Sequence, residues 1–195
     1  MSKLYSSESA VDHVTSSGDL LAFSTSSTLK LFRFAHGLIE FLAEFAINSP
    51  VNCLQVYSNF SVLCAHLDGS LVLYSVKKEP LIIVNASENI LNGLDMHDNL
   101  VAVVGDDNLL HIFDLNSNSI SSLGLQSRAL AVKFHKRYAA HLMVAEVESI
   151  ALFDVISMNC LLTVSVSSPI VSFDWHQENP SIFGALGANG RYWLW

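Results

Sequence analysis

Residues 109–115 read LLHIFDL, and a run of the same kind recurs four more times along the chain. The other runs are TLKLFRF (28–34), SLVLYSV (70–76), SIALFDV (149–155) and RYWLW (191–195). Each has an aromatic residue at its fifth position, and these residues are Phe32, Tyr74, Phe113, Phe153 and Trp195. Subtracting their numbers gives spacings of 42, 39, 40 and 42 residues, so the chain is built from a repeat.

A second apolar run precedes each aromatic run, and a short connection separates the two. These runs are DLLAFS (19–24), FSVLCAH (60–66), NLVAVVG (99–105), HLMVAE (141–146) and SIFGALG (181–187). The connections Asp68-Gly69 and Asn189-Gly190 offer the positive φ angles that tight hairpin turns require, and Asp106-Asp107-Asn108 is a weaker version of the same signal. Each pair of runs therefore predicts a β-hairpin.

Two further runs complete most of the repeats. A run precedes each hairpin after the first, namely VNCLQVY (51–57), ILNGLDMH (90–97), ALAVKFH (129–135) and IVSFDWH (170–176). Another follows the aromatic run, namely IEFLAEF (39–45), PLIIVNA (80–86), SISSLGL (119–125) and CLLTVSV (160–166). Four short strands per forty-odd residues, with an aromatic residue near the end of the third, are typical of a WD40-type propeller blade. The runs are too short and too interrupted by turn residues for helices.

The pattern predicts an all-β chain with four blades and most of a fifth. We place an incomplete WD40-type β-propeller at residues 10–195, after a flexible N-terminal segment at 1–9. A seven-bladed ring would need roughly 280 to 315 residues, so we expect this chain to be part of a larger protein. The blades are degenerate, because only Asp114 and Asp154 follow their aromatic residues as the acidic half of a WD pair, whereas Arg33 and Ser75 replace it elsewhere.

Composition narrows the classes of function. The chain is 51% hydrophobic and 14% charged, but its apolar runs are much shorter than the roughly 20 residues of a membrane-spanning helix. The first residues lack a basic region followed by an apolar one, so we expect no secretory signal. Cys53, Cys64 and Cys160 have no paired spacing, which favours buried thiols in a reducing compartment. A net charge of -8 argues against direct binding of nucleic acid.

The second half of the chain carries a more specific resemblance. Its segments are ILNGLDMHDNLVAVVGDDNLLHIFDL (90–115), HLMVAEVESIALFDV (141–155) and VSFDWHQENPSIFGALGANGRYWLW (171–195). From about Ile90 to Trp195 the chain resembles the N-terminal portion of the thirty-seven-kilodalton WD40 nucleoporins, fungal type, of the Y-shaped nuclear pore scaffold. The resemblance implies a seven-bladed propeller and a non-enzymatic adaptor. It also implies a partner in the short arm of the Y complex, a large nucleoporin with its own propeller and a helical solenoid.

The sequence contains no complete catalytic or metal-binding pattern, so we expect neither an active site nor a cofactor. His135 and His141 lie across a predicted turn without a third ligand at zinc spacing, so we interpret them as polar residues at strand ends. His176 follows a predicted first strand and is interpreted as structural. Neither a G-x-S-x-G elbow nor a phosphate-binding glycine motif occurs. Asp106 and Asp107 could bind a cation, but a turn needs such residues in any case.

Acidic residues recur at the connections between the second and third strands. In a propeller these connections share one face, so we predict an acidic rim formed by Asp68, Asp106, Asp107, Glu146 and Glu148. A solvated surface explains such charges without a partner, and a site for a basic partner is the alternative. Exposed charge of this kind acts on encounter rate and orientation more than on affinity.

Three functions are consistent with the sequence. The first, from the resemblance, is a structural adaptor at the nuclear pore in the nuclear envelope, which binds the large scaffold nucleoporin and other Y-complex subunits and supports mRNA and protein transport. The second is a WD40 adaptor of a chromatin or ubiquitin-ligase assembly that reads a peptide, with Asp106 and Asp107 as the residues to test. The third is a propeller hydrolase or lactonase with a central metal ion.

Overall fold

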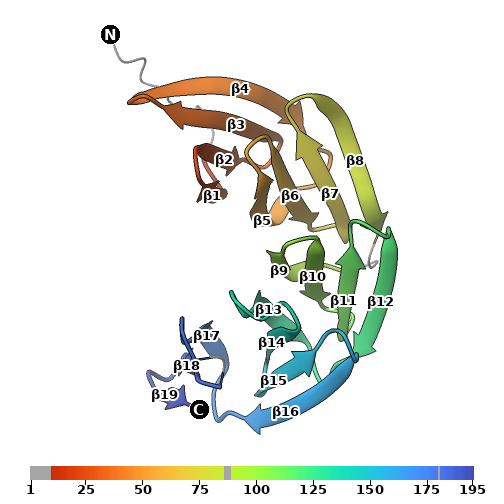
Figure 1. Ribbon diagram of the computed structural model, residues 1–195, viewed down its shortest axis with the longest axis vertical. Helices are drawn as coiled ribbons and strands as arrows, with labels where there is room; N and C mark the ends of the chain where they lie inside the picture. The colour runs from red at the N-terminus through yellow and green to blue at the C-terminus, as the bar shows by residue number, and fades with distance from the viewer. Residues whose placement is uncertain (1–9, 86–88, 180) are drawn as a thin grey trace. The chain divides into compact units, whose positions relative to one another are not determined.

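The computed structural model describes residues 10–85, 89–179 and 181–195, so the N-terminal segment 1–9 lies outside the described residues. Within this part of the chain every regular element is a β-strand, and the strands form five antiparallel sheets. Each sheet uses strands that follow one another in the sequence, as Figure 1 shows. The described segments therefore include no helix that could cross a membrane. The chain divides into two compact units, Met1–Leu91 and Asn92–Trp195.

The first unit contains two four-stranded sheets. Its first sheet is formed by β1 (His13–Ser17), β2 (Leu20–Ser24), β3 (Thr28–Ala35) and β4 (Leu38–Ala46). Its second sheet is formed by β5 (Val51–Ser58), β6 (Ser61–His66), β7 (Ser70–Ser75) and β8 (Lys78–Asn85). Leu20, Leu29 and Leu31 of the first sheet share one buried cluster with Val62 and Val72 of the second. The two sheets of this unit are therefore held together by apolar burial, the main driving force of folding.

The second unit contains two four-stranded sheets and one of three strands. The four-stranded sheets are β9 (Leu91–His97), β10 (Leu100–Gly105), β11 (Leu109–Asp114) and β12 (Ser119–Gly124), then β13 (Ala129–Phe134), β14 (His141–Glu146), β15 (Ser149–Asp154) and β16 (Asn159–Ser165). The last sheet is β17 (Ile170–Trp175), β18 (Phe183–Gly187) and β19 (Tyr192–Leu194). One apolar cluster joins the first two sheets through Leu110 and Phe153, and another joins the last two through Met143 and Trp175.

The predicted hairpin turns are confirmed by the backbone. Gly69 and Gly190 have φ angles of 81° and 77°, values that glycine adopts without a steric penalty. Asn108 supplies the same conformation, with a φ of 58°, in the turn where the sequence offers no glycine. Asparagine tolerates this left-handed region better than most residues. These turns fix the register of β6 on β7, β10 on β11 and β18 on β19.

The repeated aromatic residues do not all have the same environment. Phe32, Tyr74, Phe113 and Phe153 are buried in the third strands of their sheets. Trp195 is only half-buried and follows β19, although its backbone still exchanges two hydrogen bonds with Phe183. Its indole stacks on the Phe183 ring at 5.0 Å between centroids. The cysteines also differ, because Cys64 is buried but Cys160 is exposed, so the prediction of buried thiols is wrong for Cys160.

Candidate interaction surface

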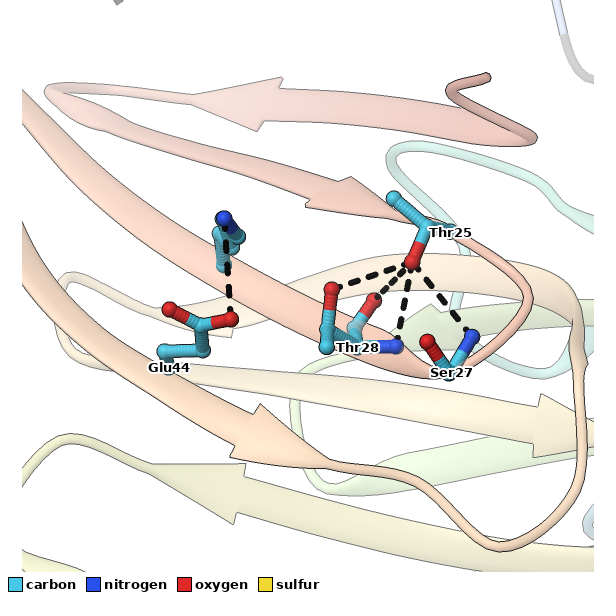
Figure 2. Close-up of polar contacts among 5 residues, drawn as sticks. Thr25, Ser27, Thr28 and Glu44 are labelled. Carbon is cyan, nitrogen blue, oxygen red and sulfur yellow. Dashed lines mark hydrogen bonds and ion pairs between the residues drawn. The ribbon is translucent and has the colours of Figure 1, made fainter. Parts of the chain in front are cut away.

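The turn between the second and third strands carries a polar side chain that closes it in four of the five sheets. In the first sheet Thr25 has this role, and Figure 2 shows its Oγ1 accepting hydrogen bonds from the amides of Ser27 and Thr28 at 3.4 and 3.1 Å. The corresponding bonds elsewhere are Ser70 N to Asp68 Oδ1, Leu109 N to Asp107 Oδ1 and Arg191 N to Asn189 Oδ1, at 3.0 to 3.1 Å. Side chains of this kind stabilise turns by replacing a backbone acceptor. Asp68 and Asp107 therefore have a structural role in their turns, whether or not they also contact a partner.

The residues of the predicted acidic rim lie at these turns but differ in what they offer to a partner. Asp68 belongs to the first unit and is exposed, whereas the other four belong to the second unit. Asp106 Oδ1 accepts a hydrogen bond from the Asn92 amide at 2.5 Å and pairs with Arg128 Nε at 2.6 Å. Much of the charge of Asp106 is thus already balanced within the protein, which weakens the case for Asp106 as a reader of basic peptides.

Glu146 is not part of an exposed rim, and this prediction is wrong. Its side chain is only 1% exposed, and its Oε2 accepts hydrogen bonds from Ser127 N at 2.7 Å and Ser127 Oγ at 3.1 Å. A buried carboxylate needs such donors because burial of an unpaired charge is very costly. Glu148, two residues further on, is exposed. The two glutamates therefore have different roles despite their proximity in the sequence.

A buried histidine links Asp107 to the outer strand of its sheet. His111 Nε2 lies 2.9 Å from Asp107 Oδ2, and His111 Nδ1 lies 2.8 Å from Ser122 Oγ. Ser122 is directly opposite His111 in the pairing of β11 with β12. Both ring nitrogens thus have polar partners, so the ring ties the turn to the outer strand. The spacing of residues in the sequence does not reveal this Asp–His–Ser chain. Pairing the predicted strands at 109–115 and 119–125 as a hairpin would have placed His111 opposite Ser122.

Two other histidines close turns after first strands, as the sequence interpretation of polar residues at strand ends predicted. His135 Nδ1 accepts hydrogen bonds from the amides of Arg137 and Tyr138 at 3.1 and 3.2 Å. His176 Nδ1 accepts from the amides of Glu178 and Asn179 at 3.2 and 3.0 Å. His135 is fully buried, and its ring packs edge-on against Trp175 at 5.0 Å. Among the described residues, no group of three or more His, Cys, Asp or Glu side chains could hold a metal ion.

We expect His135 to make the second unit sensitive to mild acid. Burial lowers the pKa of this imidazole, and the neighbouring His141, Arg137 and His97 side chains lower it further. A histidine with a depressed pKa in the folded state takes up its proton more readily when unfolded. Its contribution to stability is therefore fully present above the unfolded pKa of about 6.5 and is lost as the pH falls below it.

Thermal melts of the wild-type chain and of His135→Asn at pH 7.5 and 5.5 test this expectation. Asparagine keeps an oxygen that can accept the two turn amides but does not titrate. The wild-type Tm should fall more than the Tm of the variant between the two pH values. An equal fall in both proteins would show that other groups cause the acid sensitivity.

One face of the first sheet is apolar and exposed. Cross-strand pairs place Phe34 beside Ile39 and Phe32 beside Phe41, so these four side chains share a face. Phe34, Ile39 and Phe41 are 55%, 48% and 44% exposed, whereas Phe32 is buried beneath them. The rings of Phe32 and Phe41 meet edge to face at 5.6 Å. We call this surface the free face of the first sheet, since the opposite face packs on the second sheet.

The free face has a hollow and a polar border. A depression of about 140 Å³ is lined by Leu21, Phe32, Phe34 and Ile39, among others. At the other end of the same face an ion pair joins Lys30 Nζ to Glu44 Oε1 at 3.5 Å, and Figure 2 shows Glu44 on the adjoining strand. An apolar centre with a polar border is the usual composition of a surface that binds another protein.

A second hollow in the same unit has both polar and apolar walls. It has a volume of about 290 Å³ and lies where the connection from β4 to β5 meets the second sheet. Its lining residues are Ala46, Asn48, Ser49, His66, Asp68, Ser70, Val72, Tyr74 and Pro80. We call it the Asp68 pocket. The sequence places Asp68 on a rim but does not reveal this pocket, because its walls come from three separate segments between residues 46 and 80.

Hydrogen bonds within the protein organise the Asp68 pocket. His66 Nδ1 lies 2.6 Å from the carbonyl oxygen of Ser49, to which it donates, and His66 Nε2 lies 3.3 Å from the Tyr74 hydroxyl. Burial raises the pKa of Tyr74 to about 12, with smaller contributions from Cys64 and Asp68, so its hydroxyl keeps its proton at neutral pH. Burial also raises the pKa of Asp68, but hydrogen bonds from Ser70 and the nearby His66 ring outweigh it, and the net pKa is below the ordinary value. Asp68 is therefore ionised at neutral pH.

Comparison with solved structures identifies the fold. The chain is similar to a chain of the mitotic checkpoint complex, with a TM-score of 0.82 and 15% identity over 98% of this chain and 62% of that one. It is similar to the computationally designed Ika8 protein, with a TM-score of 0.82 and 16% identity over 97% of this chain and 59% of that one. It is also similar to the WD40 β-propeller domain of Doa1, with a TM-score of 0.76 and 12% identity over 93% of this chain and 62% of that one.

These likenesses show a WD40-type β-propeller fold, in which the four-stranded sheets are blades and β17–β19 are most of a fifth. The chain spans about three fifths of the length of each of these structures. No family model and no curated protein matches the chain. The predicted all-β propeller class is thus confirmed. At 12 to 16% identity, these likenesses show the fold alone.

Proposed function

We propose that this chain is a protein-interaction adaptor of the nuclear pore scaffold, located at the nuclear envelope. WD40 propellers are generally non-enzymatic interaction modules, and one of the similar structures belongs to a multi-protein complex. The resemblance of Ile90–Trp195 to the WD40 nucleoporins of the Y complex supports the choice of assembly. In this proposal the partner is a large nucleoporin with its own propeller and a helical solenoid, and other Y-complex subunits lie next to it. Binding of the chain to this nucleoporin supports pore assembly and the transport of mRNA and protein.

The free face of the first sheet is the observation that carries the adaptor role. Phe34, Ile39 and Phe41 expose apolar surface together on one side of a sheet, and aromatic residues in such clusters often dominate binding energy. We therefore assign the nucleoporin contact to this face. The chain would bind through a surface that is rigid before the partner arrives. The free face is formed by paired strands, and the other side of these strands packs in the buried cluster of the unit. A preformed surface loses little conformational entropy when it binds.

Affinity purification with the tagged chain from a eukaryotic cell extract tests the proposal. The wild-type chain should recover Y-complex nucleoporins, and Phe34→Ser combined with Ile39→Ser should reduce their recovery roughly tenfold or more, because the loss of contact residues of this kind costs at least about 1 to 2 kcal/mol. Ile156→Ser is the matched control, since Ile156 is an exposed apolar residue in a turn of another sheet. Its recovery should equal that of the wild type.

Two results would overturn different parts of the proposal. Recovery of no scaffold nucleoporin by the wild-type chain would reject the nuclear pore assignment. Recovery that is equally strong with the Phe34 and Ile39 variant would reject the free face as the contact. Circular dichroism of each variant shows whether the sheet has kept its fold, so a loss of recovery can be attributed to the surface.

A further inference from the structure

We infer that the Asp68 pocket binds one basic side chain, lysine or arginine, from the partner protein. The inference rests on the proposed adaptor function, because it identifies a residue type that the partner must present. It concerns a surface in the second sheet, separate from the apolar free face of the first sheet.

The charge of the pocket selects a cation. Both hydrogen bonds that Asp68 accepts from Ser70 go to Oδ1, at 3.0 Å from the amide and 2.6 Å from the hydroxyl. The hydrogen bonds from Ser70 therefore leave Oδ2 able to accept a hydrogen bond from a ligand. Asp68 is the carboxylate among the described residues that line the pocket, and these residues include neither lysine nor arginine. An anionic ligand such as a phosphate group or a carboxylate would be repelled by this charge, while the net charge of -8 attracts a basic partner over longer distances.

The remaining polar groups leave Asp68 as the main point of recognition. The ring nitrogens of His66 already face Ser49 and Tyr74, so the histidine is held in place by the protein. His66 is 2% exposed, and its fixed ring forms part of the pocket wall close to the Asp68 carboxylate. A preorganised acceptor binds more strongly than one that must first be ordered.

Size and apolar lining favour a single long side chain. The volume of about 290 Å³ lies just below the range typical of sites for small-molecule ligands, which begins at about 300 Å³. Ala46, Val72 and Pro80 provide apolar wall beside the carboxylate. Lysine and arginine combine an apolar stem with a charged end, so the stem would contact these residues while the end reaches Asp68. A metal ion would need more than one such ligand.

Peptide titration of the full chain tests the inference. The probes are acetyl-Gly-Ser-X-Ser-Gly-amide peptides in which X is arginine, lysine, norleucine or glutamate, followed by amide chemical shifts in NMR spectra. We expect the arginine or the lysine peptide to shift the amides of Asp68 and Ser70, and the norleucine and glutamate peptides to leave them unchanged. The comparison of the first two peptides decides which basic group fits better.

Asp68→Asn should raise the Kd of the basic peptide at least about tenfold, because a hydrogen bond to a charged group is replaced by one to a neutral amide. The asparagine keeps an oxygen for Ser70, so the turn is retained. The matched control is Asp154→Asn, which changes the charge equally at another turn where the carboxylate accepts the amides of Ile156 and Ser157. Its Kd should remain within about twofold of the wild-type value.

The inference is overturned if neither basic peptide binds at 10 mM, or if norleucine binds as well as arginine and lysine, or if Asp68→Asn and Asp154→Asn behave alike. These outcomes do not depend on nucleoporin recovery. Peptide binding without recovery of nucleoporins would reject the assembly and retain the pocket. Recovery that Asp68→Asn does not weaken, together with no peptide binding, would reject the pocket and retain the adaptor.

Discussion

Replacement of Gly93 by alanine is expected to lower the free energy of unfolding by about 2 to 3 kcal/mol. A Cβ atom at this position would lie 2.8 Å from Ala131 Cα, 2.9 Å from Val104 Cγ2 and 3.0 Å from Val132 N. Two of these atoms belong to the backbone of β13 in the adjacent sheet of the same unit, so they cannot rotate away. The sheets must separate locally to admit the methyl group, and packed protein interiors resist such changes.

Gly124→Ala is the matched control for this prediction. Gly124 is also a glycine within a strand, but a Cβ atom there would have nothing within 4 Å. Its φ angle is not positive, so alanine should be tolerated or should stabilise the chain by a few tenths of a kcal/mol. Urea denaturation of the two variants and the wild type measures the difference. Equal stability of all three proteins would contradict the close packing of β9 on β13.

The hairpins were predictable from the sequence because their determinants are local. Apolar runs separated by Asp68-Gly69 or Asn189-Gly190 specify both strands and the turn that joins them. The repeat of about forty residues then orders the hairpins into blades. The first strand of the first sheet, β1, was not predicted, because its sequence HVTSS (His13–Ser17) contains a single large apolar residue. Its pairing with β2 depends on backbone hydrogen bonds, which leave no signature in the side chains.

The candidate sites depend on the exact register of paired strands and on contacts between separate segments, and prediction was less successful there. The Asp68 pocket combines Asn48, Asp68 and Pro80 from three segments, and only the fold brings them together. The free face of the first sheet required the register of β3 on β4, in which Phe34 pairs with Ile39. A bulge in this pairing shifts the alternation, so a strict period of two would have misplaced part of the face.

Glu146 and Glu148 show the same limit within one turn. The sequence predicts both on an acidic rim, because the connections between second and third strands share one face of a propeller. The structure buries Glu146 and leaves Glu148 exposed. The difference follows from Ser127, which precedes β13 and brings its amide and hydroxyl to Glu146 Oε2. No local pattern around Glu146 contains that information, since the two residues are 19 positions apart.

Glu146→Ala is therefore expected to destabilise the chain by about 2 to 4 kcal/mol. The substitution removes two hydrogen bonds to a charged acceptor, each worth about 1.5 to 3 kcal/mol, and leaves the Ser127 amide without its acceptor. Glu146→Gln should fall between this variant and the wild type, because its amide oxygen can still accept one bond of the pair. Glu148→Ala should change the stability by less than about 0.5 kcal/mol, as exposed substitutions usually do.

Urea denaturation of the three variants separates burial from net charge as the cause. Glu146→Ala and Glu148→Ala change the net charge by the same amount, so a purely electrostatic effect of the acidic residues would shift both proteins equally. A loss confined to Glu146→Ala, partly restored in Glu146→Gln, would show that the carboxylate stabilises the entry to β13 through Ser127. Equal losses at the two positions would contradict this role and return Glu146 to the rim, where its charge would be available to a partner.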